Sequence, residues 1–177
     1  MSATRMIDIF IAGLALTLLL PLFLPLIVLL RCTGEGEVFY RQARLGRNEV
    51  VFDILKFATM LKNSPNLGSG NVTIRNDPRI LPLGGFLRHT KINELPQLVN
   101  ILKGEMSLIG PRPLTKDAYV GYSKEGRDLI LSLRPGLSGM ASVVFRNEES
   151  ILQSVSEPET FHKHVIGPYK ESLEVYF

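Results

Sequence analysis

An uncharged segment near the amino terminus constrains this 177-residue chain more than any other feature. The segment reads IFIAGLALTLLLPLFLPLIVLL and runs from Ile9 to Leu30. As a straight α-helix it would be about 33 Å long, which matches a hydrocarbon core of roughly 30 Å. Asp8 interrupts its start and Arg31 and Cys32 follow its end, which argues against a cleavable signal peptide. The segment therefore predicts a membrane-embedded helix that stays in the protein.

Because this segment contains two prolines, Pro21 and Pro25, it could either cross the bilayer or return to the same face. Each lacks a backbone donor and clashes with the preceding turn, so a kink or a break is expected near Leu20–Leu24. A broken helix would have two arms too short to cross the bilayer, and the chain would return to the same face. A kinked helix would span the bilayer, and composition alone favours this second path.

The distribution of positive charge indicates on which side of the membrane the rest of the chain lies. Only Arg5 precedes the apolar segment, whereas four arginines follow it: Arg31, Arg41, Arg44 and Arg47. The positive-inside rule therefore places everything after Leu30 in the cytoplasm. The whole chain has 20 basic and 17 acidic residues, a mild excess that fits an anionic partner without choosing between nucleic acid, lipid headgroups and phosphorylated substrates. Its single cysteine excludes an intrachain disulfide and a cysteine-built metal site.

The remainder predicts an α+β fold that is mostly helical. Two short strands, about 38–42 and 50–57, flank a turn at Gly46–Asn48 and predict a small β-hairpin. Residues 62–71 read as a polar loop, and 119–133 as a helix. Residues 157–177 predict a partly amphipathic helix, interrupted near Gly167 and Pro168, that could lie on the membrane surface.

The best-defined helix begins at Asn93 or Glu94. Asn93 is a good N-cap residue, and Pro96 is tolerated only in a first turn. The apolar residues of this helix follow helical spacing: Leu95, Leu98, Val99 and Leu102. Lys103 and Gly104 end the helix. The opposite, polar side is expected to carry Asn93, Glu94, Gln97 and Asn100.

Glu94 and several arginines are the candidates for chemistry. A carboxylate at a helix amino terminus can simply make a favourable electrostatic contact with the helix dipole, or it can hold Mg²⁺ together with substrate phosphates. The arginines adjoin glycines, prolines or helix boundaries: Arg88, Arg112, Arg134 and Arg146. The planar guanidinium group fits phosphate oxygens two at a time, and the prolines on both sides of Arg112 stiffen its backbone. Each arginine alone could equally be a surface ion-pair partner.

Three motifs together resemble the bacterial sugar transferases, the monotopic phosphoglycosyl transferases. They are KFATM (Lys56–Met60), NDPRILPLGGFLRHTKINELPQLVNILKGEMSLIGPRP (Asn76–Pro113) and RPGLSGMASV (Arg134–Val143). The resemblance covers nearly the whole chain. Because the chain is short, it resembles the small form of the family that has only the catalytic domain. The resemblance implies a re-entrant membrane helix over residues 1–31, broken at Pro21 and Pro25, and a cytoplasmic catalytic domain over residues 32–177. Surface amphipathic helices would add to the membrane contact of a monotopic protein at the bacterial inner membrane.

The resemblance also implies a reaction. Members transfer a sugar 1-phosphate from a nucleotide diphosphate sugar, usually a UDP-sugar, to polyprenyl (undecaprenyl) phosphate. The products are a polyprenyl-diphospho-sugar, which initiates a glycoconjugate such as an exopolysaccharide or a lipopolysaccharide, and a nucleoside monophosphate. The expected cofactor is Mg²⁺, and the expected partners are the two substrates and the membrane lipids. A homodimer is left open.

Residue by residue, the resemblance assigns roles to six positions. Glu94 matches the glutamate of the family's Asp-Glu dyad and is expected to hold Mg²⁺. Asn93 stands where the family usually has a nucleophilic aspartate. Four basic residues are expected to contact phosphate or the nucleotide: Lys56, Arg88, Arg112 and Arg146. Asp77, Pro111 and Pro113 match positions with a structural role, and Ala58 stands at a position that is often basic.

Asn93 leaves the activity open, because a carboxamide is a very poor nucleophile toward phosphorus. The amide could be an engineered replacement that stops turnover. The chain could instead use direct attack by the lipid phosphate near Glu94 and Mg²⁺, since phosphoryl transfer depends mostly on positioning and charge neutralisation. The alternative is a membrane-anchored protein that binds nucleotide sugar or polyprenyl phosphate without turnover. Nucleic acid is not expected as a partner, because the net charge is low and basic and aromatic residues do not alternate.

Overall fold

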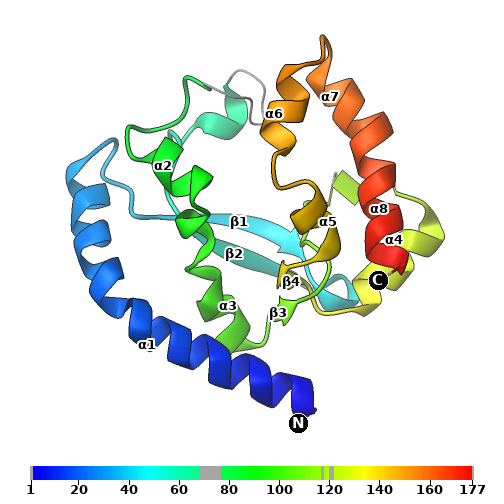
Figure 1. Cartoon of the computed structure of the whole chain (residues 1–177), viewed down its shortest axis with the longest axis horizontal. Helices are drawn as coiled ribbons and strands as arrows, with labels where there is room; N and C mark the ends of the chain where they lie inside the picture. The colour runs from blue at the N-terminus through cyan, green and yellow to red at the C-terminus, as the bar shows by residue number, and fades with distance from the viewer. Residues whose placement is uncertain (1, 68–76, 117, 120–121, 177) are drawn as a thin grey trace.

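The computed structural model describes residues 2–67, 77–116, 118–119 and 122–176. A long amino-terminal helix, α1 (Ala3–Cys32), runs along one side of a small α+β unit (Figure 1). The described strands form two pairs: β1 (Phe39–Leu45) with β2 (Val51–Phe57), antiparallel, and β3 (Ser107–Ile109) with β4 (Gly136–Ser138), parallel. The remaining helices are α2 (Gly84–His89), α3 (Gln97–Lys103), α4 (Lys124–Ser132), α5 (Met140–Val144), α6 (Glu148–Gln153), α7 (Pro158–Phe161) and α8 (Gly167–Tyr176), with helical turns η1 (Arg47–Glu49), η2 (Ser64–Asn66), η3 (Ile92–Glu94) and η5 (His162–Ile166).

The predicted hairpin and the mostly helical α+β class are confirmed, with shifted boundaries. The first strand continues to Leu45, and Asn48 and Glu49 in the turn adopt positive φ. The predicted helix start at 119 is wrong. Ser123 caps α4 by accepting a hydrogen bond from the Gly126 amide at 3.0 Å, whereas Tyr119 is buried against other parts of the chain.

The carboxy-terminal helix also differs from the expectation. Helical structure runs from Pro158 to Tyr176 without the interruption predicted near Gly167 and Pro168. A π-helical turn, η5, directly precedes Gly167 and accommodates the proline that follows. The predicted loop 62–71 is described only up to Leu67, and its remainder lies outside the described residues.

The helix α1 is continuous, so the prediction of a break at Pro21 and Pro25 is wrong. Both prolines lie inside the helix, and the ribbon bends in its second half (Figure 1). Each proline removes only one amide donor, so the surrounding helical hydrogen bonds can hold the chain together across a bend. Among the described residues, α1 is the one helix long and apolar enough to cross a membrane.

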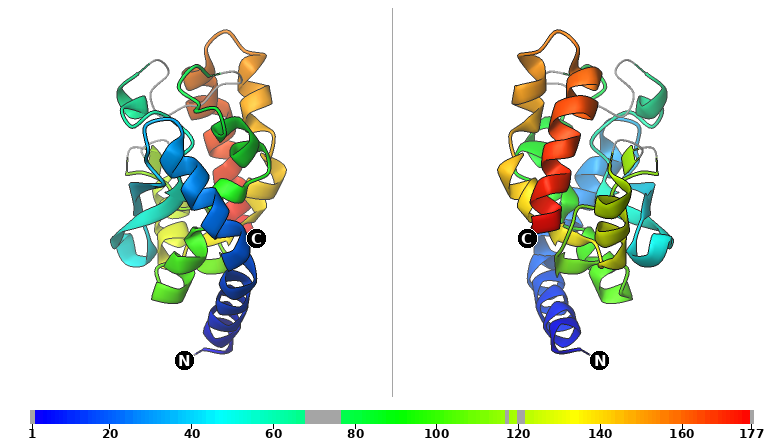
Figure 2. Two further views of the ribbon diagram at one scale, coloured as in Figure 1. Left: turned by 90° about the vertical axis from the view of Figure 1, so that its left-hand side faces the viewer. Right: turned by 90° about the vertical axis from the view of Figure 1, so that its right-hand side faces the viewer.

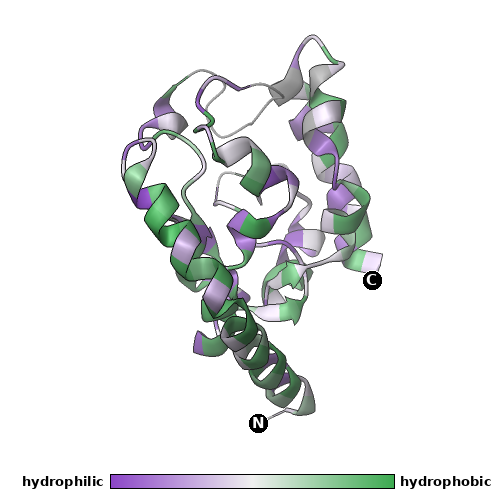
Figure 3. Cartoon of the chain, turned by 60° about the vertical axis from the view of Figure 1, so that its left-hand side comes forward, coloured by the Kyte–Doolittle hydropathy of each residue, from purple (hydrophilic) through white to green (hydrophobic). Residues whose placement is uncertain are grey.

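One face of α1 belongs to the core. Ala12 packs in a cluster with Ile54 of β2 and Ile101 of α3, and Phe23 meets the ring of Phe57 edge-on at 5.2 Å. The other face exposes large apolar side chains along the whole helix: Met6, Ile7, Phe10, Ile11, Leu14, Leu18, Leu20, Leu22, Leu24, Val28 and Leu29. The apolar colouring of α1 is seen in Figure 3, and both views of Figure 2 show its amino-terminal end projecting away from the other elements. Such an exposed apolar face fits contact with lipid better than the core of a soluble protein.

Two charged residues near the start of α1 attach it to the rest of the chain. Arg5 donates to the carbonyl oxygens of Ile101 and Leu102, at 2.6 and 2.9 Å, at the carboxy-terminal end of α3. Asp8 is buried and accepts hydrogen bonds from the Ser107 hydroxyl at 2.7 Å and the Leu108 amide at 3.0 Å. Polar partners at both positions explain how charged side chains are accommodated beside an apolar helix. The division into residues 1–31 and 32–177 stays a prediction.

We expect Asp8→Ala to lower the free energy of unfolding by about 2 kcal/mol, because it leaves the buried Ser107 hydroxyl and the Leu108 amide without an acceptor. Denaturant unfolding in detergent micelles measures the change. The matched control is Thr17→Ala, which removes an exposed hydroxyl bonded to its own helix and should cost less than about 0.5 kcal/mol. Equal losses in the two variants would contradict this account of Asp8.

Candidate active site

The segment around Asn93 differs from its prediction. Lys91 adopts a left-handed conformation with φ of 63°, the turn η3 follows, and regular helix begins only at Gln97. Asn93 is therefore not an N-cap residue. It is buried, as are Gln97 and Asn100, so the expected polar outer side of the helix faces inward. The predicted helix end is confirmed, since Gly104 follows α3 with φ of 92°.

Asn100 faces inward because its side chain pairs with the backbone of β2. Its side-chain oxygen accepts from the Leu55 amide at 3.0 Å, and its nitrogen donates to the Asp53 carbonyl at 2.8 Å. The side chain thus binds the backbone of β2 as another strand would. This contact fixes α3 against β2, on the strand that carries Lys56.

A carboxylate shared by two cations forms the centre of the site. Oε1 of Glu94 lies 3.0 Å from Nζ of Lys56 and 3.5 Å from Nη2 of Arg112. The side chains of Lys56 and Glu94 are each 16% exposed, and that of Arg112 is 38% exposed. Three separate segments meet here, since Lys56 comes from β2, Glu94 from η3, and Arg112 from the loop after β3.

The loop that carries Arg112 is fixed by backbone hydrogen bonds to β4 and β1. The Pro111 carbonyl accepts from the Gly136 amide at 2.9 Å, and the Leu114 carbonyl accepts from the Leu45 amide at 3.0 Å. A Cβ on Gly136 would lie 2.1 Å from the nitrogen of Gly110, so the close approach of these loops requires glycine there. The guanidinium is therefore presented from a rigid segment.

Arg44 adds a third cation that sequence reasoning did not assign to the site. Its Nη1 donates to the Pro113 carbonyl at 3.4 Å, and its Nη2 donates to Oε1 of Gln42. Alternation along β1 places Arg44 and Gln42 on the same face as Tyr40, the cross-strand partner of Lys56. That period-two pattern in the predicted hairpin was the signal that could have identified Arg44.

Burial and neighbouring charges perturb the pKa values of Glu94, Lys56 and Arg44. Burial alone would raise the pKa of Glu94, but the charges of Lys56 and Arg112 outweigh it and hold the pKa at about 2. Burial lowers the pKa of Lys56 to about 8, with Glu94 opposing the shift and Arg112 and Arg44 adding to it. Burial and repulsion by Arg112 lower the pKa of Arg44 to about 10. Glu94 is therefore ionised at neutral pH inside a cationic surrounding.

Comparison with known proteins identifies the family of this chain. Residues 1–165 match the model of the family described as Bacterial sugar transferase. The chain belongs to the bacterial sugar transferase family. It is 36% identical over 166 residues to the Exopolysaccharide production protein ExoY of Sinorhizobium fredii, which covers 86% of this chain and 73% of that protein.

Two other sugar transferases are longer proteins. The chain is 39% identical over 157 residues to an uncharacterized sugar transferase of Haemophilus influenzae, across 81% of this chain. It is 38% identical over 142 residues to the UDP-N-acetylgalactosamine-undecaprenyl-phosphate N-acetylgalactosaminephosphotransferase of Aeromonas hydrophila, across 79% of this chain. The match spans about 33% of the length of each of these two relatives.

In this chain, the predicted site residues separate into two groups. Lys56, Glu94 and Arg112 meet as described. Among the described residues, no ion pair joins Glu94 to Arg88, whose guanidinium contacts the Met60 sulfur at 3.8 Å, or to Arg146, which is exposed. Their predicted phosphate contacts, like the roles of the other site residues, stay predictions.

The positions given a structural role are built into the fold around the site. The Asp77 carboxylate accepts from Nε of Arg79 at 2.8 Å, and Arg79 in turn donates to the carbonyl oxygens of Ser64 and Leu67. Pro111 and Pro113 are buried on either side of Arg112, and Ala58 is buried at the end of β2. A side chain at position 58 thus points into the core in this chain rather than toward solvent.

Oxygen ligands for a cation are sparse but present. Among the described residues, no group of three or more His, Cys, Asp or Glu side chains is arranged to hold a metal ion. However, within the described part of the chain, Oδ1 of Asn93 is buried without a hydrogen-bond partner, and the ion pairs of Glu94 with Lys56 and Arg112 involve Oε1 rather than Oε2. One carboxylate oxygen and one amide oxygen on adjacent residues fit Mg²⁺, which commonly binds one or two carboxylates and takes its other ligands from phosphate and water.

The pKa of Glu94 predicts how stability depends on pH. The folded-state pKa of about 2 lies below the ordinary 4.5, so the ionised carboxylate stabilises the fold above about pH 4.5, and this stabilisation is lost as the pH falls toward 2. We expect the difference in unfolding free energy between the unchanged chain and Glu94→Gln to shrink by roughly 2 kcal/mol between pH 6 and pH 3. Denaturant unfolding at both pH values measures it, with the exposed Glu125→Gln as control. A constant difference would refute the pairing.

Proposed function

We propose that this chain transfers a sugar 1-phosphate from a nucleotide diphosphate sugar, a UDP-sugar by preference, to undecaprenyl phosphate. The products would be undecaprenyl-diphospho-sugar and UMP, the first step in building a glycoconjugate. The observation that carries the proposal is the meeting of Lys56, Arg112 and Glu94 in a chain of this family. The name of the Aeromonas relative, which includes a UDP-sugar and undecaprenyl phosphate, supports this choice of substrates.

The charge of the cluster suits a diphosphate. Lys56, Arg112 and Arg44 supply three positive charges around the single carboxylate of Glu94, which leaves a net excess of two. A diphosphate bridge between two groups carries two negative charges, so its binding would neutralise the excess. Arg112 would bind phosphate oxygens through its planar fork and Lys56 would act as a compact charge. Such positioning and neutralisation supply most of the catalysis in phosphoryl transfer.

Mg²⁺ is part of the proposal. Glu94 and Asn93 would hold it through Oε2 and Oδ1, and the ion when bound would neutralise charge that develops on the phosphate oxygens. The chain's own residues would do the remaining work. Lys56 and Arg112 orient the donor phosphates, and Glu94 keeps both cations facing the substrate.

With Asn93 in the family's nucleophile position, we propose direct attack by a lipid phosphate oxygen on the phosphorus that carries the sugar. The P–O bond to the nucleoside monophosphate breaks as the new bond forms. No covalent protein intermediate is required on this route. The partial burial of Glu94 and Lys56 limits the water that could compete as a nucleophile.

The membrane arrangement completes the proposal. The exposed apolar face of α1 would lie in the bacterial inner membrane. Because the other face of this bent, continuous helix packs on the catalytic part along its length, α1 would enter the membrane from the cytoplasmic side and return to it rather than cross, and the catalytic part would face the cytoplasm. A soluble donor and a lipid acceptor would meet at this boundary. The arginines that follow α1 support the cytoplasmic side by the positive-inside rule.

A second candidate follows from the carboxamide of Asn93. A membrane-anchored protein that binds the donor without turnover would need the cationic cluster but not a nucleophile. A single-turnover assay separates the two functions, because the enzyme yields nucleoside monophosphate and the binding protein yields only a complex.

We expect Asn93→Asp to raise the rate of nucleoside monophosphate release at least tenfold, because it supplies a carboxylate that can attack phosphorus and leave again. The assay uses full-length protein in lipid bilayers with undecaprenyl phosphate and a panel of UDP-sugars. The control is Asn93→Ala, which should show no such gain. If neither the unchanged chain nor Asn93→Asp releases the nucleotide with any donor, the transferase function is wrong. Binding of a UDP-sugar by the unchanged chain would then support the second candidate, the protein that binds donor without turnover.

Removal of divalent cations tests the metal. With EDTA present, the dissociation constant for the UDP-sugar measured by calorimetry should rise at least tenfold, and Mg²⁺ should restore it, because the ion adds ligands for the diphosphate. Glu94→Gln should lose this response to Mg²⁺. Donor binding that is equally tight in EDTA and in Mg²⁺ would contradict a magnesium site at Glu94.

A further inference from the structure

The last helix, α8, is tied by three acidic or basic side chains to three distant segments. Lys170 donates to both carboxylate oxygens of Glu148 at 2.8 Å, and the amide of Ser123, the N-cap of α4, lies 3.1 Å from both carboxylate oxygens of Glu171. Oε1 of Glu174 accepts from the backbone amide of Arg112 at 3.4 Å. The match to the family ends at residue 165, so family membership gives α8 no role.

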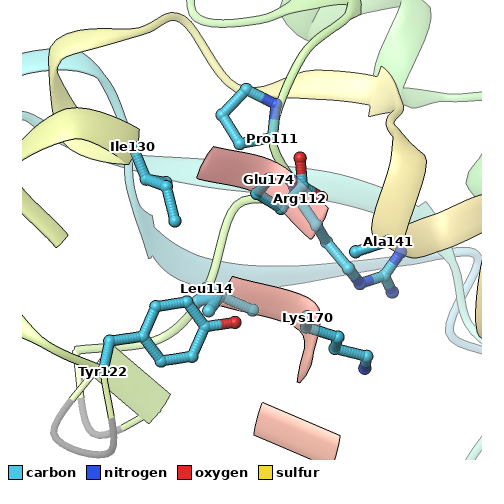
Figure 4. A pocket seen from close by; sticks show the side chains of 8 residues that line it. All are labelled: Pro111, Arg112, Leu114, Tyr122, Ile130, Ala141, Lys170 and Glu174. Carbon is cyan, nitrogen blue, oxygen red and sulfur yellow. Dashed lines mark hydrogen bonds between the residues drawn. The ribbon is translucent and has the colours of Figure 1, made fainter. Parts of the chain in front are cut away.

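Glu174 stands where two loops meet. Its carboxylate accepts from the amide of Arg112, and it lines the same small cavity as Arg112 and Ala141, the latter in the first turn of α5. Burial raises the pKa of Glu174, and the backbone at Arg112 and Ala141 opposes that shift. A Cβ built on Gly139, the residue before α5, would lie 3.3 Å from Oε1 of Glu174. No side chain of α5 caps its own first turn, and the carboxylate of Glu174 from α8 lies beside that turn. Figure 4 shows Glu174 beside Arg112, with Lys170 from the same helix nearby.

The amide of Arg112 is a special donor because of its neighbours. Pro111 and Pro113 have no backbone N–H, so Arg112 provides the single amide of this tripeptide. The carbonyl oxygens on both sides already accept hydrogen bonds, from the Gly136 amide and from Arg44. Glu174 therefore accepts a hydrogen bond from the backbone amide of Arg112, and the guanidinium of the same residue contacts Glu94.

We infer that Glu174 is a positioning residue for Arg112: it holds the backbone of Arg112 against α5, so that the guanidinium reaches Glu94 and the phosphates of the donor. The inference rests on the proposed function, in which Arg112 binds donor phosphate. It makes α8 a part of the catalytic unit rather than a peripheral helix.

The test compares donor binding with fold stability in full-length protein in lipid bilayers. Glu174→Ala should raise the dissociation constant for a UDP-sugar about tenfold, whereas Glu174→Gln keeps an acceptor oxygen and should stay within about twofold. The matched control is Glu171→Ala on the same helix. It removes the contact to Ser123 and should lower the melting temperature as much as Glu174→Ala does, yet leave donor binding within about twofold. Equal donor binding by the unchanged chain and Glu174→Ala would overturn the inference.

Amide hydrogen exchange tests, without any donor present, whether Glu174 holds the backbone of Arg112 in place. Exchange at Arg112 and Ala141 should become faster in Glu174→Ala but not in Glu171→Ala. Unchanged exchange at Arg112 would overturn the inference even if the variant bound donor poorly. If the unchanged chain binds none of the UDP-sugars, the proposed function fails together with the role of Arg112 toward the donor, and exchange alone then decides whether Glu174 holds the loop.

Discussion

The site depends on one partly buried interaction, the carboxylate of Glu94 shared between Lys56 and Arg112. Taking the charges of Glu94 and Lys56 out of water is expensive, and their attraction to each other and to the more exposed Arg112 offsets this only when the geometry is good. The fold supplies that geometry by holding each charge on a separately fixed segment: β2 for Lys56, the turn η3 for Glu94 and the loop between two prolines for Arg112. Because none of the three can move away without stranding a buried charge, the cluster ties together the segments that carry it.

The amino-terminal helix is bound into the same arrangement. Arg5 and Asp8 of α1 contact the end of α3 and the start of β3, the two segments that lie between Glu94 and Arg112 in the chain. Ala12 and Phe23 then pack α1 against β2, which carries Lys56. A helix whose other face is apolar and exposed is thus fastened to all three parts of the site. Its position at a membrane would therefore set the position of the site relative to lipid.

The sequence predicted local features well and long-range pairings poorly. The hairpin and the end of α3 at Gly104 followed from periodicity and turn residues, whereas the family motifs singled out Lys56, Glu94 and Arg112 without showing which of them pair. The inward-facing amides did not, because helical spacing identifies an apolar stripe but cannot show that Asn100 pairs with the backbone of β2. Asp8 and Glu174 were missed for the same reason. Their partners lie about 100 and 62 residues away, and nothing in the local pattern marks an acidic side chain as an acceptor for a distant amide.

The carboxamide of Asn93 separates binding from attack. An aspartate there would place a second carboxylate beside Glu94, and the two negative charges would lower the positive excess of the cluster while raising one of their pKa values. With asparagine, the excess of three cations over one carboxylate is undiminished, and an unpartnered amide oxygen remains in the site. In the proposed function, asparagine at this position would favour retention of a diphosphate while offering no carboxylate nucleophile. The carboxamide that would prevent a covalent route would thus strengthen the electrostatic basis for the proposed direct one, in which the lipid phosphate would approach a donor already bound and neutralised.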